Sequence, residues 1–174
     1  MKTGVFASLL VGFMLTSAGR CGAIKWPASC GAQAVKFDVR TETRHQPLPA
    51  PPPGKSEIVF LEDENQMIGP FMYATVRFGV DGAWVGADKG ASYFSVDVVP
   101  GVHHLCASWQ SDLHQFNRNV DLTSFTAIPG TIYYFSAIVR PVSRYEVEFR
   151  IKHLNQDLAR YRMGSAKFAR SRVK

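Results

Sequence analysis

The fold of this chain is constrained most by short segments in which apolar and polar residues alternate, because that period is typical of strands with one buried face. The alternation is clearest at Phe94, Val96 and Val98. Tight-turn dipeptides separate such segments, namely Asp81-Gly82, Pro100-Gly101 and Pro129-Gly130. We therefore predict an all-β fold, an antiparallel β-sandwich of about seven strands followed by a short C-terminal helix.

The predicted sandwich domain covers residues 54–152. Residues 24–53 precede it as an N-terminal extension, with a short strand within 34–41 and a linker in which five of residues 47–53 are proline. Residues 153–174 are expected to form a short helix and a basic tail. Asn155 is the expected N-cap and Gly164 the expected end of that helix.

The first 23 residues, MKTGVFASLLVGFMLTSAGRCGA, have the organisation of a signal peptide. Lys2 precedes an apolar run over residues 5–15, which is followed by small residues. Cleavage after Ala18, Gly19 or Ala23 fits this pattern, and we favour Ala23. The sequence thus predicts an exported protein of the periplasm or cell envelope. Attachment to lipid through Cys21 is the less favoured alternative, because Arg20 stands where a lipid-attachment motif has a small residue.

The basic residues that give the chain its net charge of +6 at pH 7 are concentrated at the C-terminus. From Lys152 onward the sequence has seven basic residues and one acidic residue, whereas the preceding part has 13 of each. We expect a solvated tail that is frayed or adds an edge strand. The alternative is peripheral contact of this tail with an anionic membrane or a cell-wall polymer. Export argues against a nucleic-acid partner.

Three cysteines in an exported protein leave one thiol unpaired unless one cysteine is removed with the signal peptide. Cleavage after Ala23 removes Cys21 and leaves Cys30 and Cys106. We predict a disulfide between these two residues, since an oxidising compartment favours it.

The segment PGVHHLC, residues 100–106, raises the question of a metal or catalytic site. In a strand His103 and His104 point to opposite faces, whereas His104 and Cys106 share one. We predict that His104 is half-buried beside the disulfide and that His103 faces solvent, with the reverse assignment as the alternative. The alternative is a metal site of His104, Cys106 and His114, or a hydrolytic site of His103, His104 and His114 with Asp112.

No G-x-S-x-G, H-E-x-x-H or phosphate-binding glycine motif occurs in the sequence. We therefore predict a non-catalytic structural or binding module without catalytic residues, metal or cofactor. Its expected partner is an envelope protein or polysaccharide. The candidate binding surface is Trp84, Tyr93 and Trp109, with Trp84 the one expected to be exposed because it follows the Asp81-Gly82 turn. Most aromatic residues, including Tyr133 and Tyr134, are expected in the core.

Several of these short motifs also occur together in a known family. They are Pro53-Gly54-Lys55, Val80-Asp81-Gly82, Gly90 before Tyr93-Phe94, Pro100-Gly101 before His103 and Leu105, and Tyr133-Tyr134-Phe135. In these motifs, over about residues 30–140, the chain resembles family 2846 of bacterial domains of unknown function, whose members are exported proteins, often described as lipoproteins. The resemblance implies a small β-sandwich of the bacterial envelope with no assigned reaction. The residues before Cys21 depart from its lipoprotein members.

Overall fold

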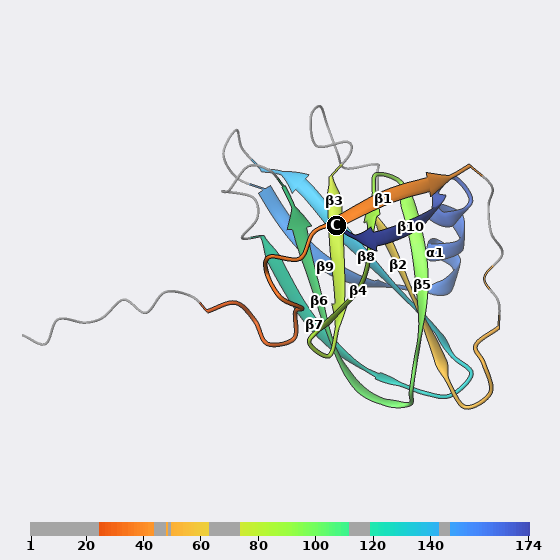
Figure 1. Ribbon diagram of the computed structural model, residues 1–174. Coiled ribbons are helices and arrows are strands. Elements are labelled where there is room, and N and C mark those ends of the chain that lie inside the picture. Colours follow the sequence, from red (N-terminus) through yellow and green to blue (C-terminus); the bar gives the residue numbers. More distant parts are fainter. Residues whose placement is uncertain (1–24, 44–47, 49, 63–73, 112–118, 143–146) are drawn as a thin grey trace, which may run out of the picture.

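A computed structural model of the protein describes residues 25–43, 48, 50–62, 74–111, 119–142 and 147–174. Within these residues the chain forms ten strands and one helix (Figure 1). In chain order they are β1 (Phe37–Glu42), β2 (Ser56–Glu62), β3 (Thr75–Val80), β4 (Ala83–Lys89), β5 (Ser92–Val98), β6 (Gly101–Gln110), β7 (Val120–Ala127), β8 (Ile132–Pro141), β9 (Val147–Leu154), α1 (Gln156–Met163) and β10 (Lys167–Val173).

The strands form two sheets, which confirms the predicted β-sandwich. One sheet has the order β1-β10-β5-β2-β8-β9, and the other has the order β4-β3-β6-β7. Most pairings are antiparallel, but β2 runs parallel to β8 and β10 runs parallel to β5. The chain between β2 and β8 passes through β3 to β7 in both sheets, so this parallel pair is joined by a long crossover and not by a hairpin.

The main core lies between the two sheets and follows the alternation seen in the sequence. Phe60 of β2 stacks on Phe78 of β3 with ring centroids 4.5 Å apart, and Phe94 of β5 packs against both rings. Burial of such large apolar side chains is the main stabilising contribution to a sandwich of this kind.

A second, smaller core lies on the outer face of the six-stranded sheet, where α1 covers its central strands. Val59 and Leu61 of β2 pack there with Ala159 and Met163 of α1. The helix begins and ends as predicted, since the Asn155 side chain accepts a hydrogen bond from the Leu158 amide and Gly164 follows the last turn. No helix in the described ranges is long and apolar enough to cross a membrane.

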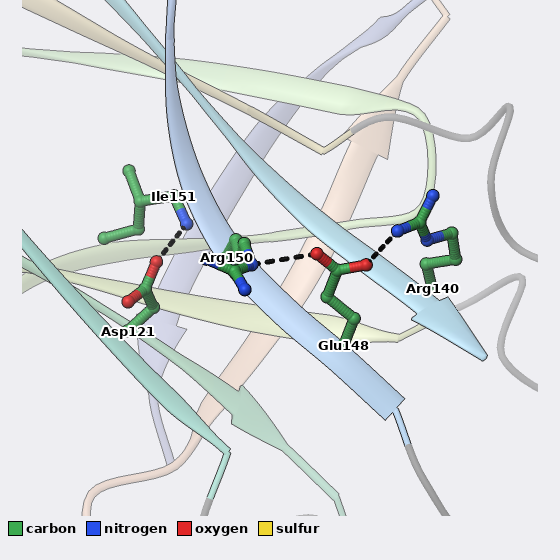
Figure 2. Close-up of polar contacts among 5 residues, drawn as sticks. All are labelled: Asp121, Arg140, Glu148, Arg150 and Ile151. Carbon is green, nitrogen blue, oxygen red and sulfur yellow. Dashed lines mark hydrogen bonds and ion pairs between the residues drawn. The ribbon is translucent and has the colours of Figure 1, made fainter. Parts of the chain in front are cut away.

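The two sheets approach each other at the edge strands β7 and β9 (Figure 2). The Ile151 amide of β9 donates a hydrogen bond of 2.7 Å to the Asp121 carboxylate of β7. Beside this contact, Glu148 of β9 lies between Arg140 and Arg150 and forms an ion pair with each. The Asp121 side chain thus joins the edge strands of the two sheets.

The C-terminal segment departs from the sequence expectation. Residues 167–173 form β10, which is neither a frayed tail nor an edge strand, because it lies between β1 and β5. It pairs with β1 in antiparallel register from Phe37–Val173 to Glu42–Phe168 (orange and dark blue in Figure 1). The strands placed by sequence before and after the domain of residues 54–152 therefore belong to the same sheet as β2.

Candidate anion-binding face

The pairing of β1 with β10 gathers positive charge on one exposed surface. Val39 and Ala169 face the core, so the residues that alternate with them face outward. We call this surface the basic face; its polar residues are Lys36, Asp38, Arg40, Glu42, Arg170, Arg172 and Lys174. Five of these seven residues are basic and two are acidic. The basic residues of the C-terminal segment thus form part of a domain face.

Two ion pairs partly neutralise the basic face. The Arg170 guanidinium lies 2.5 Å from the Glu42 carboxylate, and that of Arg172 lies 3.2 Å from Asp38. Arg170 also lies over the Phe168 ring, at 5.5 Å from its centroid. These contacts restrict the orientation of two guanidinium groups on the surface.

The surroundings of Arg40 differ from those of Arg170 and Arg172. It is the direct cross-strand partner of Arg170, and like charges in that position destabilise a sheet. Among the described residues, no acidic side chain forms an ion pair with Arg40. An anion bound at this position would offset the repulsion.

The basic face is hollowed beside these arginines. A depression of about 130 Å³ is lined by Asp38, Arg40, Arg170, Ser171 and Arg172. A larger groove of about 340 Å³ adjoins it, since Asp38 lines both, and Lys36, Lys89 and Lys174 contribute to its wall. The depression and the groove give an anionic ligand a shaped and positively charged surface.

The favoured assignment of the two histidines is wrong, because His103 is the buried one and His104, on the same strand face as Cys106, is exposed. His103 Nδ1 lies 2.6 Å from the Asp81 carboxylate, and Nε2 lies 2.7 Å from the Val99 carbonyl oxygen. Burial alone lowers the pKa of His103, but its bonds to Val99 and Asp81 and the charge of Asp81 outweigh burial and raise it. Both ring nitrogens are thus engaged in holding two turns together.

The alternative metal site does not assemble in the described residues. Cys106 is bonded to Cys30, as predicted, so its sulfur is not a thiolate ligand. His114 and Asp112 lie outside the described residues, as do the predicted signal peptide and Cys21. The ranges that the structure describes hold no group of three or more His, Cys, Asp or Glu side chains able to hold a metal ion.

The predicted aromatic surface is not an exposed surface. Tyr93 is 0% exposed and Trp109 is 4% exposed, so neither is available to a partner. Trp84 is partly buried beneath residues 25–36, which we call the N-terminal segment. Its indole N–H donates to the Ala32 carbonyl oxygen at 2.9 Å, and Gly31 lies so close that a Cβ there would meet the ring at 2.3 Å.

Arg77 explains why the N-terminal segment lies on this sheet. Its guanidinium is buried and donates to the carbonyl oxygens of Gln33, at 3.0 Å, and Val35, at 2.5 Å. It also lies 4.7 Å from the Trp84 ring centroid. Burial lowers the pKa of Arg77 to about 10. The Arg77 guanidinium and the Trp84 ring hold the N-terminal segment in place, so they do not offer a free binding site.

Asp88 and Glu62 form a second buried polar contact, between the two sheets. They are 0% and 3% exposed. Burial raises the pKa of Asp88 well above its usual value, and the neighbouring Glu62 side chain lowers it in part. Burial of this kind favours the neutral form of Asp88. Their enclosure separates them from any surface ligand.

The sequence contains a signal for the basic face that its composition alone does not reveal. Arg170, Arg172 and Lys174 recur with a period of two, which is the spacing of one strand face.

No comparison yields a relative, since no protein-family model, curated protein or solved structure matches the chain. The resemblance to family 2846 and its implications therefore stay predictions.

Proposed function

We propose that this protein is an exported, non-catalytic β-sandwich module of the bacterial cell envelope, and that it binds an anionic polysaccharide through the basic face of β1 and β10. The observation that carries the proposal is the cluster of Arg40, Arg170 and Arg172 around one depression. Clustered cations attract polyanions, and a shaped site adds orientation to that attraction.

Two further observations support an oxidising compartment and a non-catalytic role. The disulfide joins Cys30 to Cys106, a bond that is typical of exported proteins. His103, the buried member of the histidine pair, has both ring nitrogens occupied by structural contacts. The alternative of a metal-binding or hydrolytic domain using His103, His104 and His114 has weaker support, because Cys106 and His103 are already engaged.

The test removes three positive charges from the basic face. The triple variant Arg40→Gln, Arg170→Gln and Arg172→Gln should elute from an anionic polysaccharide resin at a much lower salt concentration than the wild type, because its electrostatic attraction to the resin is reduced. The salt concentration at elution is the measurement.

The matched control removes the same number of charges from the opposite edge of the sheet and from α1. It carries Arg150→Gln, Lys152→Gln and Arg160→Gln, all at exposed positions. Arg150 is also paired with a glutamate, as Arg170 is. We expect this control to elute close to the wild type. Equal losses in both triple variants would show that net charge alone drives retention and would overturn the proposal.

A further inference from the structure

We propose that the depression between Arg40, Arg170 and Arg172 is a subsite for a phosphomonoester group carried by a polysaccharide. This inference rests on the proposed function, because it specifies the ligand chemistry of the same basic face. It makes Arg40 the specificity-determining residue, since Arg170 and Arg172 already have carboxylate partners.

The backbone register places the three arginines close to one point. Arg40 lies directly opposite Arg170 and diagonally opposite Arg172, because Asp38 is the partner of Arg172. Directly opposed Cβ atoms are about 5 Å apart and diagonal neighbours about 7 to 8 Å apart in an antiparallel pair. Guanidinium groups on such positions can reach a single anion in the depression that they line.

A phosphomonoester fits three guanidinium groups better than a carboxylate does. It presents three acceptor oxygens and a charge of about −1.5 to −2 at neutral pH, and such a group forms charge-assisted hydrogen bonds to arginine clusters. A carboxylate has two oxygens in one plane and a single charge, so one bidentate arginine largely satisfies it. On this face Asp38 and Glu42 each form an ion pair with one arginine.

The surroundings of the depression favour a polysaccharide over a membrane as the source of the phosphate. Proteins that bind lipid surfaces place apolar side chains beside their basic residues. Among the described residues, the exposed large apolar side chains are Val99, Val102, Leu122, Ile128, Val142, Tyr161 and Val173. None of them is an outward-facing residue of β1 or β10. Val173 is the one that belongs to β10, and it faces the opposite side of the sheet from its neighbours Arg172 and Lys174.

The experiment compares three dextrans and one vesicle, using the full mature protein at physiological salt. One dextran carries phosphomonoesters, the second carries carboxymethyl groups to the same total charge, and the third is unmodified. The vesicles contain phosphatidic acid. We expect the phosphorylated dextran to bind about tenfold more tightly than the carboxymethyl dextran, because only the former engages all three guanidinium groups.

The variant Arg40→Lys keeps the charge but removes the planar fork of donors, so it should lose most of this tenfold preference. Arg150→Lys is the matched control and should keep it. Equal binding of the two charged dextrans, or an unchanged preference in Arg40→Lys, would overturn the phosphomonoester subsite while leaving the proposed function intact. Failure of both charged dextrans to bind would overturn the proposed function itself. Binding to the vesicles but not to the phosphorylated dextran would overturn the polysaccharide source.

Discussion

At the scale of single residues, His103 joins two turns that lie far apart in the sequence. Its ring contacts Asp81 in the β3–β4 turn and the Val99 carbonyl at the end of β5. Asp81 also accepts a hydrogen bond from the His104 amide. These contacts hold Asp81 in a left-handed conformation, with φ of 51°, which Gly82 follows with φ of 86°. A protonated His103 donates to both partners, so its charge state contributes to stability.

This contribution should depend on pH in a defined direction. The folded-state pKa of His103 is raised, so its stabilisation is complete below the unfolded value of about 6.5 and is lost as pH rises through the folded value. The pKa of Asp81 is lowered by its histidine contacts despite the opposing effect of burial, so Asp81 stays ionised across that range.

The variant His103→Gln should therefore be destabilised by about 1 to 3 kcal/mol at pH 5.5 and by less at pH 8.5. Urea unfolding at the two pH values measures this difference. His104→Gln is the matched control at the exposed neighbouring position and should change stability little at either pH. A loss in His103→Gln that is the same at both pH values would contradict a charged His103.

The roles of individual residues could be predicted from the sequence only in part. Strand alternation correctly separates His103 from His104, but it leaves open which one is buried, because that depends on which sheet face meets the core. The pairing of Cys30 with Cys106 is confirmed. Trp84 was expected to be exposed beside its turn, yet the N-terminal segment covers it, since Arg77 and Cys106 on the same face bind that segment.

At the scale of elements, the N-terminal segment is held on the four-stranded sheet by one covalent bond and several hydrogen bonds. The disulfide spans a sequence separation of 76 residues. The Gly82 amide also donates to the Ser29 carbonyl oxygen, at 3.1 Å. The segment leads directly into β1, so its attachment also positions one strand of the basic face.

Replacement of both cysteines, Cys30→Ala with Cys106→Ala, should lower the free energy of unfolding by about 2 to 4 kcal/mol, because the unfolded chain regains the freedom that the closed loop removes. Urea unfolding of this variant measures the loss, and the wild type with its disulfide reduced should lose a similar amount. Stability within about 0.5 kcal/mol of the oxidised wild type would contradict this role of the disulfide.

Local signals account for the elements that were predicted correctly. The Asp81-Gly82 turn and the N-cap at Asn155 depend on neighbouring residues alone, so sequence is sufficient to place them. The position of β10 depends instead on its pairing with β1, at the other end of the chain. Because no local pattern specifies a partner so distant, the sequence indicated a strand or tail without its place in the sheet.

At the scale of the whole molecule, alternation and turns were enough to predict a β-sandwich, but not its strand order or its two parallel pairings. The basic face is a consequence of that order. Lys36 and Arg40 belong to a part of the chain with no net charge, and they contribute to a charged surface only because β1 lies beside β10. A count of charges along the sequence therefore locates the basic C-terminal segment, but it does not reveal that this segment and β1 together form the basic face.

The measurement that tests the binding face most directly is arginine footprinting with and without a bound phosphorylated dextran. An arginine-selective dicarbonyl reagent and peptide mass spectrometry report the reactivity of each side chain. We expect the dextran to protect Arg40, Arg170 and Arg172, while Arg150 and Arg160, which are exposed elsewhere, continue to react. Protection of Arg150 and Arg160 to the same extent as Arg40, or no protection of Arg40 under saturating dextran, would contradict binding at the face of β1 and β10.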